Sequence, residues 1–395
     1  MKSAKASLDS LRKRAAGAVS ACLAWLKRRS WRDFLLSGLA LVLVVASIVA
    51  VAFAGTLSRY YRVMVAPAGT VPLSEESRSA MDGKAKQLAA ALEARLDRKK
   101  DLSGEAWPSA QILVALREND PGNSRRINSR TIERYFRSIA GPECACWRRQ
   151  PKAQFPNHLG LSAWVVWTLA AYGIPAQRGE IEFLLSTQDR DGGWPIFSDA
   201  RQKQSSSYAT AAAIFALHQQ SKFETSPERR SRLAAAVQRG ADWLTSRAAP
   251  GRARWADYPG GSGSRESLGV SGFVLYVLHG VGAPGLVELD RAWLRELPDG
   301  EPLALGGEVS PKKIQVGARS YRDDTRYYAL PWGILATVLA YPIASLEDRA
   351  RAIEWLERNL EPGAPLYSVT GRERNVSIGA EILLALRANL EAKRD

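Results

Sequence analysis

Short apolar stretches recur along the chain after residue 76, and each is apolar on nearly every side. The six stretches are "SAQILVAL", "LSAWVVWTL", "YATAAAIFAL", "LGVSGFVLYVL", "ALPWGILATVL" and "SIGAEILLAL". A helix that is apolar all round belongs in the interior of a folded protein. Their last leucines are Leu116, Leu169, Leu217, Leu278, Leu339 and Leu386, at intervals of 47 to 61 residues. The pattern predicts six buried helices in a repeat with loops of variable length.

A second type of helix is predicted between the buried ones. It is amphipathic and ends in an aromatic residue beside an aliphatic or second aromatic one, as in "IEFL", "ADWL" and "IEWL". The aromatic residues are Tyr135, Phe183, Trp243, Trp293 and Trp355, and a further upstream helix carries Met81, Ala85, Leu88, Leu92 and Leu96 at helical spacing. Six outer and six inner helices in alternation predict an all-α fold, an (α/α)6 toroid over residues 76–395, because each pair buries its apolar stripe against neighbouring pairs.

The stretch "FLLSTQDRDGGW", residues 183–194, follows one of the outer helices. Its Phe183, Gln188 and final Trp194 resemble the QW repeat of squalene cyclases and of the related prenyltransferase β-subunit toroids. Partial copies with similar aromatic spacing occur at residues 135–147, 243–255 and 355–367. The resemblance implies the toroid fold of the terpenoid cyclase and protein prenyltransferase superfamily, and it says little about activity.

We interpret this motif as a structural joint. Its members are Gln188, Asp191, Gly192, Gly193 and Trp194. A Gln side chain bonds backbone groups at a helix end, glycines allow a tight reversal, and a Trp ring buries itself over a neighbouring helix. Asp191 is then expected to serve in the turn or as a cap, with no role in catalysis.

Candidate ligand-binding residues lie where the predicted inner helices begin, around the mouth of a central cavity. The densest group is "YRDDTRYY", residues 321–328, in which Asp323 and Asp324 are the candidate catalytic acids beside Arg322, Arg326 and Tyr327. At a helix start successive residues point about 100° apart, so one carboxylate is expected to face the cavity and the other to cap the helix. The competing interpretation is a capped helix start with surface ion pairs. The other candidate ligand-binding residues are Tyr208, His158, Trp164, Glu266 and Arg374.

The resemblance implies no particular mechanism. Squalene-type cyclases use an Asp-x-Asp-Asp string, and complement-type thioester toroids use a Gly-Cys-Gly-Glu-Gln string, neither of which occurs. Protein prenyltransferases hold zinc with an Asp, a Cys and a His, but no Cys or His lies near residues 321–328. The three cysteines and three histidines have no zinc-site spacing, so neither a metal nor a cofactor is predicted. Cys144 and Cys146 either form a strained disulfide with each other or bond a second chain.

The first 75 residues follow a different pattern. Residues 34–57 carry no charge over 24 positions, which is long enough at about 1.5 Å per residue to cross a hydrocarbon core of about 30 Å. A transmembrane helix in the lipid bilayer is therefore predicted, with cleavage near Ala54 as the alternative. Residues 1–33 carry nine Lys or Arg against two Asp, which predicts a cytoplasmic N-terminus and an extracytoplasmic C-terminal domain. This basic segment is expected either to lie on the membrane leaflet as an amphipathic helix or to act only as a topology signal. Residues 58–75 are predicted to form a linker.

Charge and fold together narrow the possible partners. Of the net charge of +15, residues 1–33 supply +7 and two further arginines supply +2, which leaves +6 and does not indicate nucleic-acid binding. The sequence favours a membrane-anchored toroid that binds or scaffolds an envelope lipid, glycan or protein. Two enzyme classes stay open: a glycan-active hydrolase or lyase with an acid at the cavity mouth, and an enzyme like the isoprenoid cyclases or prenyltransferases.

Overall fold

The computed structural model describes Val42 and most of the chain after residue 70. The described ranges are residues 71–98, 106–120, 127–141, 146–148, 157–198, 204–260, 265–309, 312–316, 319–323, 326–369 and 376–391. The chain divides into two compact units, Met1–Arg62 and Val63–Asp395. The predictions for residues 1–33, 34–57 and 58–70 lie outside the described residues, except that Val42 is helical and exposed. Among the described residues, no helix has the length and apolar character needed to cross a membrane.

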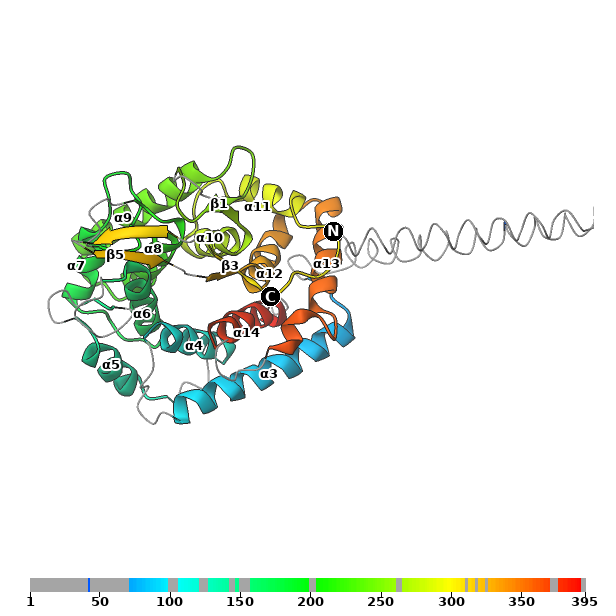
Figure 1. Cartoon of the computed structure of the whole chain (residues 1–395), viewed down its shortest axis with the longest axis horizontal. Helices are drawn as coiled ribbons and strands as arrows, with labels where there is room; N and C mark the ends of the chain where they lie inside the picture. Colours follow the sequence, from blue (N-terminus) through cyan, green and yellow to red (C-terminus); the bar gives the residue numbers. More distant parts are fainter. Residues whose placement is uncertain are drawn as a thin grey trace, which may run out of the picture. The chain divides into compact units, whose positions relative to one another are not determined.

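Twelve described α-helices alternate between an inner and an outer ring (Figure 1). The inner helices are α4 (Ala106–Asn119), α6 (Leu159–Ala171), α8 (Ser207–Ser221), α10 (Leu268–Val281), α12 (Ala329–Ala340) and α14 (Val376–Glu391). The outer helices are α3 (Glu75–Arg98), α5 (Ser129–Ser138), α7 (Arg178–Ser186), α9 (Pro227–Arg247), α11 (Leu286–Arg295) and α13 (Leu346–Leu360). All six predicted apolar stretches lie in inner helices, so the predicted all-α toroid is confirmed.

The inner ring is closed. Each inner helix packs on the next one in chain order, and α14 packs on α4. In the outer ring, α13 likewise contacts α3. Residues 159–169 of α6 are all buried, whereas α13 buries a stripe that includes Ile353 and Leu356 and leaves its other face towards solvent. The hydrophobic pattern of the sequence thus distinguishes helices that are buried on all sides from helices that are buried on one side.

The same tryptophan joint links outer and inner helices in three successive repeats. The indole N–H groups of Trp147, Trp194 and Trp255 donate to carbonyls near the ends of α5, α7 and α9, over 2.7 to 2.8 Å. Their backbone N–H groups donate to a Ser or Thr hydroxyl of the following inner helix, over 2.9 to 3.0 Å. All three rings are buried. Three of the four copies of the aromatic spacing thus share one set of contacts, whereas in the fourth, residues 355–367, the backbone N–H of Tyr367 donates to the carbonyl of Ala364.

Three short antiparallel strand pairs lie in the connections before α10 and α12. They are β1 (Trp255–Ala256) with β2 (Glu266–Ser267), β3 (Gly307–Val309) with β6 (Arg326–Tyr328), and β4 (Lys312–Val316) with β5 (Arg319–Asp323). The predicted helix start in residues 321–328 is therefore wrong, because this segment belongs to β5 and β6 and α12 begins only at Ala329. β5 pairs with β4, from which only two residues separate it, and β6 pairs with β3, and this pairing holds the backbone extended. Asp323 lies in β5, so the expected helix-start geometry does not apply to it, and Asp324 lies outside the described residues.

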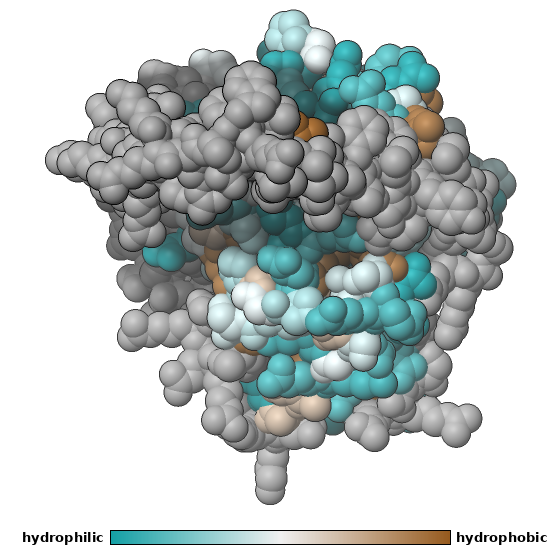
Figure 2. Space-filling model, turned by 90° about the vertical axis from the view of Figure 1, so that its right-hand side faces the viewer, coloured by the Kyte–Doolittle hydropathy of each residue, from teal (hydrophilic) through white to brown (hydrophobic). Residues whose placement is uncertain are grey.

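The described outer surface of the toroid exposes few large apolar side chains. On the face drawn in Figure 2, hydrophilic residues cover most of the described surface, and hydrophobic residues form small separate patches. The large hydrophobic side chains exposed among the described residues are Val42, Phe223, Val287 and Leu346. Scattered residues of this kind are normal on protein surfaces. The candidate chemistry is found inside the inner ring.

Candidate functional site

Aromatic side chains from four inner helices meet inside the ring. Trp164 of α6 stacks on Phe273 of α10 with ring centroids 6.0 Å apart, although α8 separates these helices in the ring. Phe273 in turn contacts Trp332 of α12 at 4.7 Å. A second layer of rings lies further along the helices, where Trp167 contacts Phe215 at 4.5 Å and Tyr276 at 6.3 Å. At this depth the interior is filled by packed rings.

A buried acid lies beside this aromatic cluster. Glu381 of α14 is 5% exposed and Gln111 of α4 is 3% exposed. The Nε2 of Gln111 donates to Oε1 of Glu381 over 3.1 Å, across the seam that closes the inner ring. The amide oxygen of Gln111 and the other carboxyl oxygen of Glu381, Oε2, are buried and have no hydrogen-bond partner among the described residues. Buried polar atoms without a partner are uncommon in folded proteins, which makes this pair a candidate functional group.

Burial controls the charge of this acid. It raises the pKa of Glu381 to about 8, and hydrogen bonds from Trp332 and Gln111 lower this pKa in part. The carboxyl group is therefore protonated at neutral pH and carries a proton that it can donate. Tyr208 and Tyr328 lie close enough to Glu381 to feel its charge. The pKa of both phenols is raised, first by burial and then by the negative charge of Glu381 in its ionised form.

Tyr208 connects the acid to the start of the inner helices. Its hydroxyl accepts a hydrogen bond of 2.7 Å from the indole of Trp164, and its ring stacks on Trp107 with centroids 6.0 Å apart. Trp107 also contacts the ring of His158 edge to face at 4.7 Å. Trp107 and Tyr328 are only half-buried, so the group reaches the surface at the N-terminal ends of the inner helices. We call Trp107, Gln111, Tyr208, Tyr328, Trp332 and Glu381 the Glu381 site.

A second buried carboxylate, Asp257, holds the rim of this site together. It accepts hydrogen bonds from the hydroxyls of Ser206 and Tyr327 and from the backbone N–H of Tyr208, over 2.6 Å, 2.5 Å and 3.2 Å. Ser206 is itself the N-cap of α8. Asp257 thus fixes the first turn of α8 against the segment that precedes α12. With both oxygens engaged by the protein, it serves as a positioning group.

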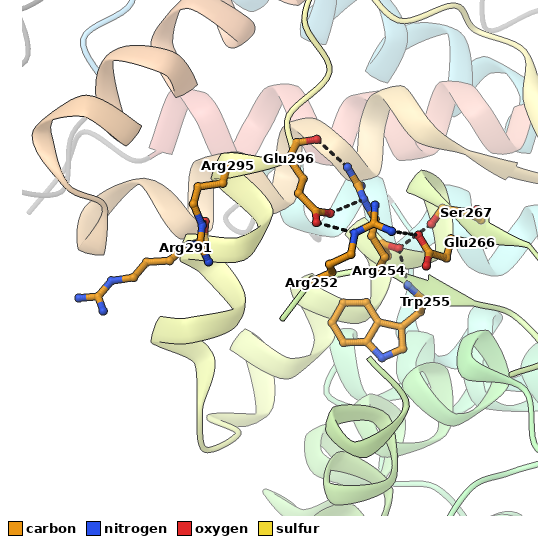
Figure 3. A network of polar contacts seen from close by, with 9 residues as sticks. Arg252, Arg254, Trp255, Glu266, Ser267, Arg291, Arg295 and Glu296 are labelled. Carbon is orange, nitrogen blue, oxygen red and sulfur yellow. Dashed lines mark hydrogen bonds and ion pairs between the residues drawn. The ribbon is translucent and has the colours of Figure 1, made fainter. Parts of the chain in front are cut away.

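An ion-pair network braces the hairpin that carries Asp257 (Figure 3). Arg252 pairs with Glu266 of β2 at 3.0 Å and with Glu296 at the end of α11 at 2.6 Å. Arg254 is almost buried, donates to the side chain and the carbonyl of Glu296, and lies 5.1 Å from the ring of Trp293. Glu266, a predicted ligand-binding residue, is exposed and engaged in this network. Through these contacts Glu266 helps to anchor β1 and β2 to α11.

The structure brings some of the predicted site residues together. Trp164, Tyr208 and His158 form one buried group with Trp107, and His158 also caps α6 by accepting a hydrogen bond from Leu161 N–H. Tyr327 joins this group through Asp257 and a ring contact of 5.2 Å with Tyr208.

The remaining predicted site residues lie in the segments before α12 and α14. Arg326 is exposed in β6, opposite Val309. Arg322 and Asp323 belong to β5, where their backbones pair with Lys313 and Lys312. Asp324 and Arg374 lie outside the described residues. Of the side chains in this segment that the structure describes, Tyr327 and Tyr328 lie at the site.

Sequence reasoning missed the most distinctive groups. Glu381 and Gln111 are polar residues inside apolar stretches in which a serine is the only other polar residue, "SIGAEILLAL" and "SAQILVAL". A lone polar side chain in a helix predicted to be buried on all sides is a usable signal, because it needs an internal partner or a ligand. Trp332 and Asp257 carry no comparable signal, since their roles depend on contacts between distant segments.

The loop of residues 188–194 is held by hydrogen bonds within the loop and to α9 and the start of α8. Gln188 Nε2 donates to the carbonyls of Gly192 and Ala236 over 2.9 Å and 3.0 Å. Asp191 accepts from Gly193 N–H, the Ser205 hydroxyl and the Trp243 indole, over 2.8 to 3.2 Å. Gly192 has a φ of +97°, which favours glycine. These contacts fit a structural joint between α7 and α8.

Cys146 is not part of the Glu381 site. Cys146 is buried and disulfide-bonded, whereas Cys144 lies outside the described residues. In the part of the chain that the structure describes, no group of three or more His, Cys, Asp or Glu side chains is arranged to hold a metal ion.

Comparison with known proteins points to a structural likeness. No family model matches the chain, and no curated protein matches it. The fold is similar to the crystal structure of a family 76 glycoside hydrolase from a bovine Bacteroides thetaiotaomicron strain, with 11% identity and a TM-score of 0.46. The similarity covers 73% of this chain and 69% of that chain.

Proposed function

We propose that the protein is a glycan-active hydrolase in which Glu381 acts as the general acid. The observation that carries this proposal is the buried Glu381 carboxyl group, whose Oε2 has no hydrogen-bond partner and whose pKa is raised to about 8. A carboxylic acid kept protonated by an apolar environment is the arrangement that glycosidases use to protonate a leaving group. This role favours the glycan-active interpretation over a scaffold without chemistry of its own.

The surroundings of Glu381 also favour a sugar as the ligand. Aromatic faces alternate there with polar groups, namely the amide of Gln111, the hydroxyl of Tyr208 and the indoles of Trp164 and Trp332. Sugar rings combine apolar faces with hydroxyl groups, so such a site complements them. An isoprenoid chain would need a long apolar space, but the deeper rings of Trp167, Phe215 and Tyr276 pack against each other. Because these packed rings do not suit an isoprenoid chain, we propose that any likeness to the terpenoid cyclase superfamily extends to the fold and not to an isoprenoid substrate.

In the proposed reaction, Glu381 transfers its proton to the glycosidic oxygen as the bond from that oxygen to the anomeric carbon breaks. Water supplies the hydroxyl group at the anomeric carbon, and its remaining proton passes to a carboxylate. Asp323 and Asp324 are the candidates for this second carboxylate, since they precede Tyr327 and Tyr328 in the chain. Asp257 holds the rim through its bonds to Ser206, Tyr208 and Tyr327.

We further propose that the enzyme acts outside the cytoplasm, tethered by residues 34–57 and facing envelope glycans. The positive charge of residues 1–33 supports this topology. The disulfide at Cys146 supports it too, because disulfides persist in oxidising compartments.

The first test measures hydrolysis and its dependence on Glu381. Hexaoses of glucose, mannose, galactose, N-acetylglucosamine and galacturonic acid are incubated with the protein, and products are followed by mass spectrometry. We expect cleavage of at least one neutral hexaose, and a loss of about 10²- to 10⁴-fold in Glu381→Gln, the usual contribution of a general acid. Activity should also fall as the pH rises above about 8, when Glu381 loses its proton.

Glu354→Gln is the matched control, because Glu354 lies on α13 in a partly exposed pair with Arg358. This variant should retain wild-type turnover. Cleavage by Glu381→Gln at the wild-type rate, or no cleavage of any hexaose, would contradict the proposal.

A further inference from the structure

A pocket on the outer wall of the toroid lies between α7 and α9, which follow each other around the outer ring (Figure 1). It has a volume of about 90 Å³, and every residue that lines it is among the described ones. Its apolar lining consists of Ala176, Ile181, Leu185 and Leu233, which are half-buried or buried. Charged side chains surround this apolar lining and form the rim.

Hydrogen bonds at the starts of both helices hold the walls of the pocket in place. At α7, the backbone N–H of Gln177 donates to Glu180 over 2.7 Å, and that of Ala176 donates to the Gln220 side chain of α8 over 2.9 Å. At α9, the N-cap Ser226 donates its own backbone N–H to Glu224 over 2.9 Å. The pocket therefore resembles the largely pre-formed sites that proteins use for binding.

Two charged side chains of the rim have no partner in the described part of the chain. Glu182 and Arg232 form a two-pronged pair over 2.7 and 2.8 Å, and one oxygen of Glu224 accepts a backbone N–H. Arg178 and Arg229 are exposed, and neither side chain makes an ion pair or hydrogen bond with another described residue. The rim thus carries three arginines against two glutamates, and its unpaired charge is positive.

These two arginines lie where a helix favours the opposite charge. Arg178 is the first residue of α7, and Arg229 is in the first turn of α9. The N-terminal end of a helix carries a partial positive charge, so a cation there is slightly unfavourable for the helix. Residues that conflict with a local preference and bring no visible gain to the fold are expected at functional sites. A bound anion would compensate both positions.

We propose that this pocket binds an acidic segment of a partner protein, in which one apolar side chain is flanked by carboxylates. The apolar side chain fills the pocket, and the carboxylates pair with Arg178 and Arg229. Pockets that enclose small molecules typically hold about 300–1,000 Å³, whereas one apolar anchor within a polar rim is the usual anatomy of a protein interface. Phe223, one of the few exposed large hydrophobic side chains, directly precedes Glu224 of the rim and adds apolar surface there.

The pocket and the Glu381 site lie at different ends of the helices. Ala176 and Glu224 belong to the connections that follow the C-terminal ends of α6 and α8. The Glu381 site reaches the surface at the N-terminal ends of the inner helices. A partner in the pocket does not cover that end, so this inference goes beyond the proposed hydrolysis and does not depend on it.

The test measures peptide binding. Fluorescein-labelled pentapeptides are titrated into the full-length protein in a non-ionic detergent at low salt, and binding is followed by fluorescence polarisation. The first peptide has leucine between two pairs of glutamates, the second has alanine in place of leucine, and the third has lysines in place of the glutamates. We expect the first to bind at least about 10-fold more tightly than the others, because alanine leaves the pocket unfilled and lysine reverses the charge. Added salt should weaken its binding.

The double variant Arg178→Gln/Arg229→Gln should bind the leucine–glutamate peptide about 10-fold more weakly than the wild type. Arg130→Gln/Arg291→Gln is the matched control, because it removes the same charge from exposed positions of α5 and α11 that do not line the pocket. It should bind like the wild type.

Three results would overturn the inference: equal binding of the three peptides, equal losses in the two double variants, or no binding of the leucine–glutamate peptide. Hexanoate that bound as tightly as this peptide would overturn it too, since the pocket would then be a site for small amphiphilic anions. Hydrolysis and its dependence on Glu381 are measured with separate substrates, so a failure of this inference and a failure of the proposed function can be told apart.

Discussion

At the scale of single residues, keeping Glu381 in the interior has a free-energy cost. Gln111 donates a hydrogen bond to one of its oxygens, while burial raises its pKa from 4.5 to about 8. A shift of this size corresponds to at most about 5 kcal/mol of unfavourable free energy at high pH. Replacing a buried ionisable group by an apolar one of similar volume is often neutral or stabilising, so this cost is consistent with the role proposed for Glu381.

The cost can be measured through the pH dependence of stability. In the folded state Glu381 binds its proton more tightly than in the unfolded state, so it lowers the free energy of unfolding as the pH rises from about 4.5 to about 8. Glu381→Gln removes this titration. Urea unfolding at pH 5 and at pH 8.5 should show a loss of several kcal/mol in the wild type that is smaller in the variant. Parallel losses in both proteins would mean that the pKa of Glu381 is not raised.

At the scale of elements, close helix packing is obtained with glycines. A Cβ atom on Gly272 of α10 would lie 2.6 Å from the backbone carbonyl of Trp332 in α12, which is far inside van der Waals contact. The close approach of α10 to α12 brings Phe273 and Trp332 into contact at 4.7 Å. The glycine therefore helps to set the arrangement of rings beside Glu381.

A pair of alanine substitutions tests this requirement. Gly272→Ala should lower the free energy of unfolding by about 1–3 kcal/mol, because overpacking forces α10 and α12 apart. Gly83→Ala is the control in an outer helix, since Gly83 of α3 is exposed and an added Cβ atom there would have no neighbouring atom within 4 Å. It should raise stability by about 0.5–1 kcal/mol. Equal effects of the two changes, measured by urea unfolding, would mean that the contact with Trp332 is unimportant.

At the scale of the whole molecule, the described toroid bears on the chemistry of the protein, and the apolar segment of residues 34–57 bears on its location. The toroid holds the candidate chemistry, whereas the N-terminal segment is proposed to set where that chemistry takes place. Its charge asymmetry predicts an exported domain that stays tethered. The disulfide at Cys146 is in accord with that compartment.

Reporter fusions at Asp395 test this topology. An export-dependent reporter should be active and a cytoplasm-dependent reporter inactive, with the fusion protein recovered in the membrane fraction at full length. Activity of the cytoplasmic reporter alone would refute the topology. Recovery of a shortened, soluble form would indicate cleavage near Ala54.

The sequence by itself determined the helices and their order, because burial on all sides or on one side leaves a periodic pattern that can be read locally. The repeated tryptophan joints were also visible as spacings, since each joint spans only one repeat. Tertiary structure decided the site. Gln111 and Glu381 are 270 residues apart and meet only because the last inner helix packs on the first. The segment of residues 321–328 was misjudged as a helix start for a more local reason, since β5 pairs with the neighbouring β4 and β6 pairs with β3 of the same connection. Contacts created by ring closure leave no periodic trace in the sequence, and the Glu381 site is made of such contacts.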